Sequence, residues 1–301
     1  MESFASNAKL GKGDHIFTEA DESDGSFLLL RPRKAVIANI DNDHLETYNN
    51  NIEELKKSFK NFCLNIPFHG RIFANGDSSE VLDVIGNLPR NVTSYGFSEI
   101  NDFQISDFSQ NKNGSEFSLL NKSNKKKMKF KTNMIGRHNV SNTVAAIIVA
   151  LDEGISYEDI KDSLEKFIVI ERRFQIISEK VFNKDIVLID DYGHHPNELS
   201  VSINTVKEVW PERKLLVVFQ PHRYTRTKAL FQEFIDILAS CENLILLEVY
   251  PASESPIPNY ESENLIREIH KKNPSAKLVT GIEEAYDAMS DFIEDNFVFL
   301  S

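Results

Sequence analysis

The sequence has few cysteines, no long apolar run and no excess of positive charge. Its 301 residues include two cysteines, Cys63 and Cys241, which are too few and too far apart for a disulfide framework or a metal knuckle. No apolar run approaches the roughly 20 residues that span a bilayer, and the amino-terminal segment lacks the residue order of a signal peptide. These absences predict a soluble protein of the reducing cytoplasm.

The charge balance narrows the classes of partner. The chain carries 34 Lys and Arg residues against 46 Asp and Glu residues, a formal net charge of -12. Such a balance argues against a nucleic-acid or anionic-membrane surface, because those partners need a basic field. An anionic substrate still fits where local basic side chains hold it. The length favours two domains.

From residue 169 onward, short apolar runs alternate with longer amphipathic stretches. The expected strands cover residues 186–189, 215–219, 244–249, 277–279 and 297–300. The expected helices cover residues 198–209, 227–239, 261–271 and 283–293. Strict alternation of strands and helices predicts a doubly wound domain with a parallel sheet covered on both faces.

The first part of the chain is less uniform. Strands are expected at 36–40 and 71–75, and helices at 52–62, 79–85, 142–153 and 157–167. Between them, residues 92–135 contain short alternating segments at 103–108, 116–120 and 129–132, which predict a small antiparallel subsheet. The domain boundary is expected near residue 168, which gives domains of residues 1–168 and 169–301.

Two acidic clusters in the first part could bind a metal ion. The segment EADESD at residues 19–24 places four carboxylates within six residues, and DNDH at 41–44 follows an expected strand. Carboxylates together with the imidazole of His44 suit Mg²⁺ or Mn²⁺ that keeps several water ligands. The alternatives are an exposed acidic loop and a structural histidine.

The segment GRHNVSN at residues 136–142 leads into an Ala-rich helix. Asn139 or Asn142 could cap that helix through its side-chain oxygen. Capping explains one asparagine. At this spacing both amides and the imidazole of His138 could instead face the edge of a nucleobase.

Two further motifs follow strands of the second part. IDDYGHHP places two carboxylates, a tyrosine and two imidazoles at 190–195, after the apolar run 186–189. A turn explains only Gly193 and Pro196, whereas open α/β sheets bind ligands at the carboxyl ends of strands. In FQPHRYTRT, Arg223 and Arg226 suit a carboxylate or phosphate, or else they are solvated at a helix start.

Taken in order, these blocks resemble the Mur ligases. The matching blocks, which lie within residues 19–254, are EADESD, DNDH after its strand, GRHNVSN, ERRFQ, DDYGHHP, FQPHRYTRT and VYPASE. The resemblance implies a central ATPase domain, a C-terminal Rossmann-like domain and ATP-driven amide-bond formation through an acyl phosphate. DDYGHHP is similar to members that add L-alanine to UDP-N-acetylmuramate in peptidoglycan precursor synthesis, whereas tripeptide-recycling members typically read DDFAHHP.

The resemblance implies nucleotide and metal contacts at matching positions. It makes Glu19 and His44 the ligands of Mg²⁺, which Mn²⁺ could replace. The expected contacts to adenine and to the rest of the nucleotide are His138, Asn139, Asn142, Arg173, Asp191 and His195. The alternative for Arg172 and Arg173 is an inter-domain salt bridge.

The substrate contacts are implied in the same way. Tyr192 and His194 are expected to face the UDP-sugar, and Arg223 and Arg226 to bind substrate and the charge that develops on phosphate. Together with His195, these two arginines are the expected catalytic residues. The end of the strand at 186–189 is then the wall of a cleft between two domains.

Part of the family pattern is absent from the sequence. Nothing in it matches G-x-x-x-x-G-K-[ST] or the family's GTHGKT phosphate loop, and Ser253 replaces the glycine that usually precedes Glu254. We therefore expect a piece of a ligase that is truncated at both ends and inactive alone. The alternatives are a tripeptide-recycling ligase, a relative of folylpolyglutamate synthase, and a non-catalytic nucleotide-binding protein that has lost its phosphate loop.

Overall fold

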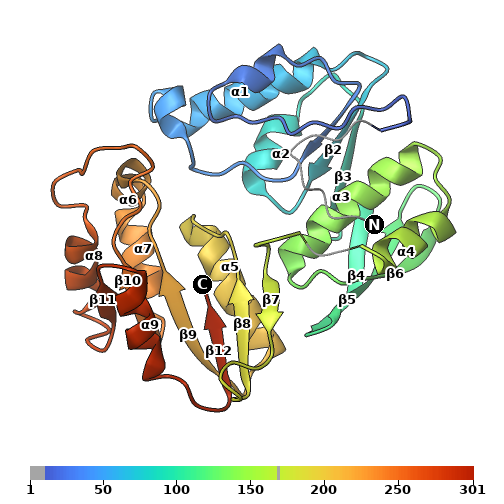
Figure 1. Cartoon of the computed structure of the whole chain (residues 1–301). Coiled ribbons are helices and arrows are strands. Elements are labelled where there is room, and N and C mark those ends of the chain that lie inside the picture. The colour runs from blue at the N-terminus through green and yellow to red at the C-terminus, as the bar shows by residue number, and fades with distance from the viewer. Residues whose placement is uncertain (1–10, 168–169) are drawn as a thin grey trace. The chain divides into compact units, whose positions relative to one another are not determined.

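The computed structural model describes residues 11–167 and 170–301. The chain divides into two compact units, residues 1–168 (the first unit) and residues 169–301 (the second unit), each with its own sheet (Figure 1). Residue 168, near which the domain boundary is expected, lies outside the described residues.

The sheet of the first unit joins a parallel part to an antiparallel part. Its strand order is β1-β2-β3-β4-β5-β6, and the strands are Lys34–Ile37 (β1), Arg71–Asn75 (β2), Val92–Gly96 (β3), Phe103–Asn111 (β4), Gly114–Asn121 (β5) and Lys126–Thr132 (β6). Strands β1 to β4 pair in parallel, and β4, β5 and β6 pair antiparallel. The predicted antiparallel subsheet is confirmed for β4 to β6. Strand β3 also lies within the predicted range of residues 92–135, but it belongs to the parallel part of the sheet.

Helices cover both faces of this sheet. They are Ser26–Leu29 (η1), Leu45–Tyr48 (η2), Ile52–Asn65 (α1), Ser79–Ile85 (α2), Arg137–Asp152 (α3) and Tyr157–Glu165 (α4). Side chains cap three of them, because Asn51, Ser78 and Ser156 accept hydrogen bonds from the first turns of α1, α2 and α4. Helix α3 packs on β2 and β3, and α4 packs on β6.

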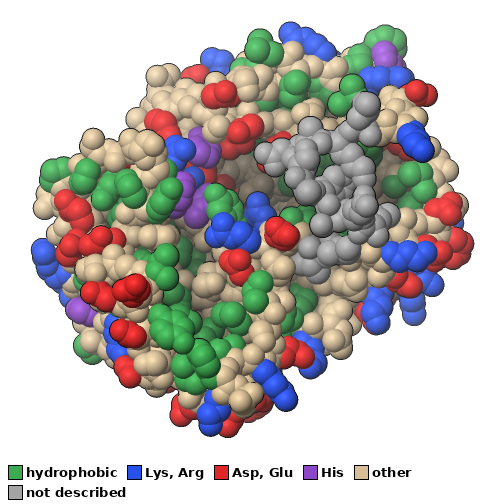
Figure 2. Space-filling view, viewed as in Figure 1, with side chains coloured by type: hydrophobic (Ala, Val, Ile, Leu, Met, Phe, Trp, Pro, Cys, Tyr) green, Lys and Arg blue, Asp and Glu red, His purple; other side chains and the backbone are tan. Residues whose placement is uncertain are grey.

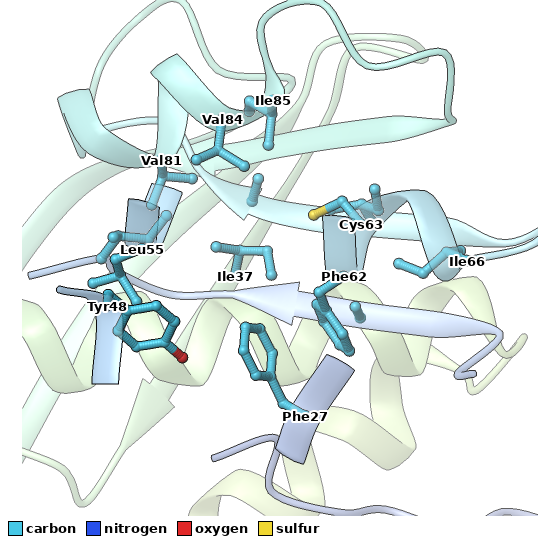
Figure 3. Packing of buried hydrophobic residues seen from close by; sticks show 14 residues of the cluster. Phe27, Ile37, Tyr48, Leu55, Phe62, Cys63, Ile66, Val81, Val84 and Ile85 are labelled. Carbon is cyan, nitrogen blue, oxygen red and sulfur yellow. The ribbon is translucent and has the colours of Figure 1, made fainter. Parts of the chain in front are cut away.

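Successive side chains of β2 belong to two different hydrophobic cores. Ile72 and Ala74 belong to one hydrophobic cluster and Phe73 to another, because successive side chains of a strand point to opposite faces. Figure 3 shows the first cluster, in which Phe27 and Phe62 point into a core shared with residues of β1 and α1. The ring centroids of Phe27 and Phe62 are 5.2 Å apart.

The second unit contains a mostly parallel sheet with the order β11-β10-β9-β12-β8-β7. Its strands are Gln175–Ser178 (β7), Ile186–Asp190 (β8), Lys214–Phe219 (β9), Asn243–Leu247 (β10), Lys277–Val279 (β11) and Phe297–Leu300 (β12). The five expected strands, β8 to β12, pair in parallel as predicted, and β7, which was not predicted, adds an antiparallel strand next to β8. The short segment QIIS lies at the sheet edge, where only one side needs a partner. Strand β12 lies between β8 and β9.

The helices of the second unit connect these strands. They are Pro196–Val209 (α5), Tyr224–Ala229 (α6), Phe231–Leu238 (α7), Ser262–Ile269 (α8) and Ile282–Ser290 (α9). The single helix expected at 227–239 is two helices, because Leu230 leaves the helical conformation with φ -115° and ψ 26°. In the described ranges, no helix has the length and apolar character needed to cross a membrane.

Candidate functional site

Hydrogen bonds tie the acidic segment EADESD to η2, the short helix that follows DNDH. The hydroxyl of Tyr48 donates to the carbonyl oxygen of Glu22, and Thr47 Oγ1 donates to the carbonyl oxygen of Ser23 at 2.5 Å. Burial and the nearby carboxylates of Glu22, Asp24 and Asp21 raise the pKa of Tyr48 to about 12. The EADESD segment is therefore anchored to η2, the short helix that follows DNDH.

His44 lies at the start of η2, whereas the side chain of Glu19 is exposed. The imidazole Nε2 is 3.6 Å from Asp43 Oδ2, and Nδ1 is 4.0 Å from Glu46 Oε1. Within residues 11–167 and 170–301, no group of three or more His, Cys, Asp or Glu side chains is arranged to hold a metal ion. The carboxylate of Glu19 and the imidazole of His44 fit a cation that takes most of its ligands from water and phosphate.

The motif at 136–142 forms the first turns of α3. The helix begins at Arg137 with Gly136 as its N-cap, at φ 102°, so the prediction that Asn139 or Asn142 caps the helix is wrong. The prediction failed because the helix starts five residues earlier than the expected 142. Asn139 is buried and its Nδ2 donates to the carbonyl oxygen of Ile135 at 2.7 Å, while Asn142 is exposed. At a spacing of three, both amides share one face of the helix.

An aromatic contact missed at the sequence level holds the start of α3. The guanidinium carbon of Arg137 lies 3.7 Å from the ring centroid of Phe97 and 5.5 Å from that of Phe108. The backbone N–H of Gly136 donates to Gln110 Oε1 at 2.8 Å. Residues of β4 and of the loop after β3 thus position the helix turn that carries His138 and Asn139.

In the second unit, the carboxylate of Asp191 organises the loop after β8. Its Oδ1 accepts a hydrogen bond from the N–H of Gly193 at 2.7 Å. Its Oδ2 accepts from the N–H of Phe174 at 2.9 Å and from Ser202 Oγ at 3.1 Å. A cavity of about 20 Å³, enough for a water molecule, lies beside it, with Leu300 among the lining residues. Asp191 therefore joins the chain before β7 to the loop before α5 and to Ser202 within α5.

His195 is the N-cap of α5, in a reciprocal arrangement with Glu198. His195 Nδ1 accepts from the N–H of Asn197 at 3.2 Å, and Glu198 Oε2 accepts from the N–H groups of His195 and His194 at 3.2 and 3.0 Å. Glu198 Oε1 is also 3.8 Å from Arg173 Nη1. Glu198 was not among the predicted residues, although its position three residues after the N-cap is the spacing of a capping box.

The two arginines before β7 pair within the second unit. Arg172 Nε lies 3.5 Å from Asp190 Oδ2, and Arg173 pairs with Glu198. Neither of these two pairs is the inter-domain salt bridge considered as an alternative. They instead fix the orientation of the loop that contains the ERRFQ block.

Aromatic and imidazole rings form a row across the carboxyl ends of three strands. The ring centroids of Tyr192 and His194 are 5.2 Å apart, those of His194 and His222 6.0 Å, and those of His222 and Tyr250 5.4 Å. The guanidinium of Arg172 lies 4.7 Å above the ring of Tyr192. The row therefore connects the loops that follow β8, β9 and β10. His222 and Tyr250 were not among the predicted site residues.

Arg223 and Arg226 are held at the end of β9. Arg223 opens α6 with φ 72°, and Arg226 is buried with Nη1 3.3 Å from the carbonyl oxygen of His222. Burial lowers the pKa of His222, and the charge of Arg226 lowers it further. The site therefore favours a neutral imidazole beside a fixed guanidinium.

A carboxylate from the next loop supports this turn. Glu254 accepts hydrogen bonds from the N–H and Oγ1 of Thr225 at 3.0 and 2.7 Å. Burial opposes its ionisation, but these bonds and the charge of Arg223 outweigh burial and lower the pKa of Glu254. Glu254 follows Ala252 and Ser253, which both have positive φ angles of 46° and 72°.

The surface around these loops mixes both signs of charge. Acidic and basic side chains are interspersed over the face drawn in Figure 2. The positive charge of Arg223 and Arg226 is therefore a local feature of a chain whose net charge is -12.

Comparisons with protein families assign both units. A model of the Mur ligase middle domain matches residues 4–150, and a model of the Mur ligase glutamate ligase domain matches residues 172–301. The chain belongs to the Mur ligase family. Both sheets and their connecting helices are those of its middle and C-terminal domains.

Curated relatives within the Mur ligases match the whole chain. UDP-N-acetylmuramate–L-alanine ligases of Legionella pneumophila strains Corby and Lens are each 38% identical over 302 aligned residues. Each alignment covers 100% of this chain and 64% of the relative. The chain thus spans about two thirds of the length of these relatives.

Solved structures of Mur ligases share the fold. UDP-N-acetylmuramate–alanine ligase of Thermotoga maritima matches with a TM-score of 0.71 at 24% identity, over 93% of this chain and 58% of that chain. A murein peptide ligase of Psychrobacter arcticus matches with a TM-score of 0.60 at 22% identity, over 91% and 55%.

Proposed function

We propose that the chain supplies the ATP-binding and C-terminal parts of a ligase that joins L-alanine to UDP-N-acetylmuramate for peptidoglycan synthesis. The observation that carries the proposal is the 38% identity, along the whole chain, to ligases of that name. We place the reaction in the cytoplasm, since Cys63 and Cys241 are both buried free thiols. Because the sequence contains no phosphate loop, catalysis needs that element from elsewhere.

The first turns of α3 are the proposed adenine site. Adenine presents an amino donor next to a ring-nitrogen acceptor. The amide nitrogen of Asn139 already donates to Ile135, which leaves its Oδ1 as the atom that can accept from the adenine amino group. Asn142 lies exposed on the same helix face and can donate to the ring nitrogen, with His138 alongside.

Glu19 and His44 are the proposed protein ligands for Mg²⁺, for which Mn²⁺ could substitute. A bound ion would neutralise charge on the phosphate oxygens. The tether from Tyr48 to Glu22 keeps the two ligand segments together. Arg173, Asp191 and His195 are the proposed nucleotide contacts of the second unit.

The substrate side is built on the loops after β8 and β9. Tyr192 and His194 are the proposed contacts to the UDP-sugar. A carboxylate oxygen of the muramoyl group attacks the γ-phosphorus of ATP, ADP leaves, and an acyl phosphate forms. The amine of L-alanine then attacks the acyl carbon, and phosphate leaves. Arg223 and Arg226 stabilise the charge that develops in both steps.

Phosphate release tests the proposal. With ATP, Mg²⁺, UDP-N-acetylmuramate and L-alanine, we expect no release above background from the 301-residue chain, because losing even one preorganised donor costs about 10² to 10³ in rate. A protein that joins the chain to the parts of a Mur ligase that it does not cover, among them the phosphate loop and the substrate domain, should release phosphate only with L-alanine. In that protein, Arg226→Ala should lower turnover strongly.

Control substrates distinguish the alternatives. Replacing L-alanine by the tripeptide L-alanyl-γ-D-glutamyl-diaminopimelate tests a recycling ligase. Phosphate release that requires the tripeptide would contradict the proposed substrate. Alanine-dependent release by the 301-residue chain alone would overturn the need for an added phosphate loop.

A further inference from the structure

The first unit contains a concave site away from the motifs of the family. It is an open cavity of about 270 Å³ between the sheet and the end of α3. Arg71, the first residue of β2, and Lys126, the first residue of β6, are among its lining residues. The cavity is therefore formed at the strand ends where the parallel strands begin.

The cavity lies at the amino ends of the parallel strands, whereas the proposed ATP site lies at their carboxyl ends. The acidic segment DNDH follows the carboxyl end of β1, whereas the cavity lies at the amino end of β2, its parallel neighbour. Strand β2 has five residues, so its two ends are about 13 Å apart at roughly 3.3 Å per residue. A ligand in the cavity would not occupy the nucleotide position.

The floor of the cavity is apolar. Phe73, Met128 and Ile148 line it from β2, β6 and α3, and all three are buried. A ligand with an apolar body would cover these side chains, and burial of apolar surface is the main driving force for binding in such pockets.

The rim is rich in hydrogen-bond donors. Asn121 Oδ1 accepts from the N–H of Ser123, and Asn124 Oδ1 accepts from the N–H of Lys126, so both amide nitrogens remain as donors towards a ligand. In the described part of the chain, the ammonium of Lys126 belongs to none of the ion pairs on this unit. Lys126 lies on the same face of β6 as Met128.

The carboxylate at the rim is already neutralised. Asp152 pairs with Arg71 and also with Lys34, whose Nζ lies 2.6 Å from Asp152 Oδ2. Lys34 Nζ also lies 2.5 Å from Glu153 Oε1, so these two cations are balanced by two carboxylates, and Lys126 adds a further positive charge. The rim attracts an anion.

We propose that this cavity binds a small organic anion, with an apolar ring on the floor and a carboxylate at Lys126, Asn121 and Asn124. The volume of about 270 Å³ lies at the lower limit for small-molecule pockets, so the ligand is smaller than a nucleotide. The proposal is independent of the ligase activity, since neither ATP nor the amide-forming step takes part in it.

Methionine methyl NMR tests the proposal directly. The chain contains 4 methionines, among them Met128 on the cavity floor and Met289 in α9 of the second unit. Titration of ¹³C-methyl-methionine-labelled chain with 1-naphthoate should shift the Met128 signal saturably and leave Met289 unchanged. The neutral analogue 1-naphthamide should bind more weakly, and inorganic phosphate should leave Met128 unchanged.

A matched pair of variants tests the role of the rim. Lys126→Gln should weaken 1-naphthoate binding about fivefold, the effect of losing one partly exposed charge interaction. Lys129→Gln removes the same charge from the opposite face of β6 and should leave binding unchanged. The proposal is overturned if Met128 shows no saturable shift up to about 10 mM probe, if Met289 shifts equally, if naphthamide binds as well, or if both variants weaken binding equally.

Discussion

The motif residues of the two units are held in different ways. In the second unit, Asp191, His195 and Glu254 use their own side chains to fix the surrounding backbone. In the first unit, Glu19 and Asn142 have exposed side chains, and their segments are anchored by other residues such as Tyr48. Structure and proposed chemistry are thus combined in these single residues of the second unit. In the first unit they are divided among residues, except at Asn139, whose Nδ2 also donates to the carbonyl oxygen of Ile135.

This difference determines what a substitution can teach. A change at Asp191 alters both the loop and any ligand contact, so lost activity alone would not identify a ligand. A change at Asn142 removes an exposed amide and leaves the helix intact. Stability measurements on both units are therefore needed to interpret activity data.

The largest effect is expected for Asp191→Ala. It removes the acceptor of the N–H groups of Phe174 and Gly193 and of Ser202 Oγ, which leaves donors of the half-buried loop unsatisfied. We expect the free energy of unfolding of the second unit to fall by about 2 to 4 kcal/mol. The sequence has 1 tryptophan, the buried Trp210 after α5, so its fluorescence during urea unfolding reports on this unit.

The matched change in the first unit is Asn142→Ala. We expect the free energy of unfolding, followed by hydrogen exchange of α3, to change by less than about 0.5 kcal/mol, because the side chain is exposed. If Asn142→Ala proved as destabilising as Asp191→Ala, the distinction between the two units would be wrong.

A smaller effect is expected when the anchor of the acidic segment is removed. Tyr48→Phe loses the hydrogen bond to the carbonyl oxygen of Glu22 and should cost about 1 kcal/mol. Tyr157→Phe is the control, because its hydroxyl donates to the carbonyl oxygen of Lys129 at 2.6 Å in the same unit. Both variants should lose similar stability, measured by calorimetry.

Only Tyr48→Phe should weaken binding of Mn²⁺, followed by electron paramagnetic resonance. Its phenol ties EADESD to η2, the helix that His44 caps, whereas Tyr157 is bonded to β6. Equal Mn²⁺ affinity in the two variants would show that the hydrogen bond from Tyr48 to Glu22 does not support metal binding. The proposal that Glu19 and His44 bind one ion would then be contradicted.

Several elements could be predicted from the sequence because their apolar pattern is local. The ranges 71–75, 79–85, 277–279 and 297–300 agree with β2, α2, β11 and β12. Strand β7 was missed because none of its four side chains is buried, and its sequence QIIS lacks the longer apolar run of β8. The start of α3 was placed too late because Gly136 caps it with a backbone conformation rather than with a typical capping side chain.

The candidate site was less predictable than the strands. Motif spacing and family resemblance identified the loops, and the structure confirms that the polar segments after β1, β8 and β9 follow strand ends. The partners of those loops are distant in sequence. The contact of Tyr48 with Glu22, and that of Glu254 with Thr225, depend on the folded chain and have no local pattern.

Ser253→Gly should stabilise the second unit slightly. Ser253 has a φ of 72°, a conformation that costs an L-residue roughly 1 kcal/mol or more and costs glycine little. Part of this gain is lost to the greater freedom of glycine in the unfolded chain, so we expect about 0.5 kcal/mol. Ser253→Ala keeps the Cβ atom and should give no gain. A loss of stability in the glycine variant, seen in the Trp210 transition, would show that the turn tolerates serine without strain.

The smallest effect is the pH dependence contributed by His222. Burial lowers its pKa in the folded state below the ordinary value of 6.5, so between the two values the unfolded chain binds more protons than the folded chain. The contribution of His222 to the free energy of unfolding is therefore fully present above pH 6.5 and declines as the pH falls below that value.

Urea unfolding of the second unit, followed by Trp210 at pH 7.5 and 5.5, should show a smaller pH dependence in His222→Gln than in the unchanged chain. His69→Gln removes an exposed imidazole of the first unit and should leave that dependence unchanged. The same pH dependence in His222→Gln and in the unchanged chain would mean that His222 is protonated equally in both states, and the neutral imidazole beside Arg226 would have to be abandoned.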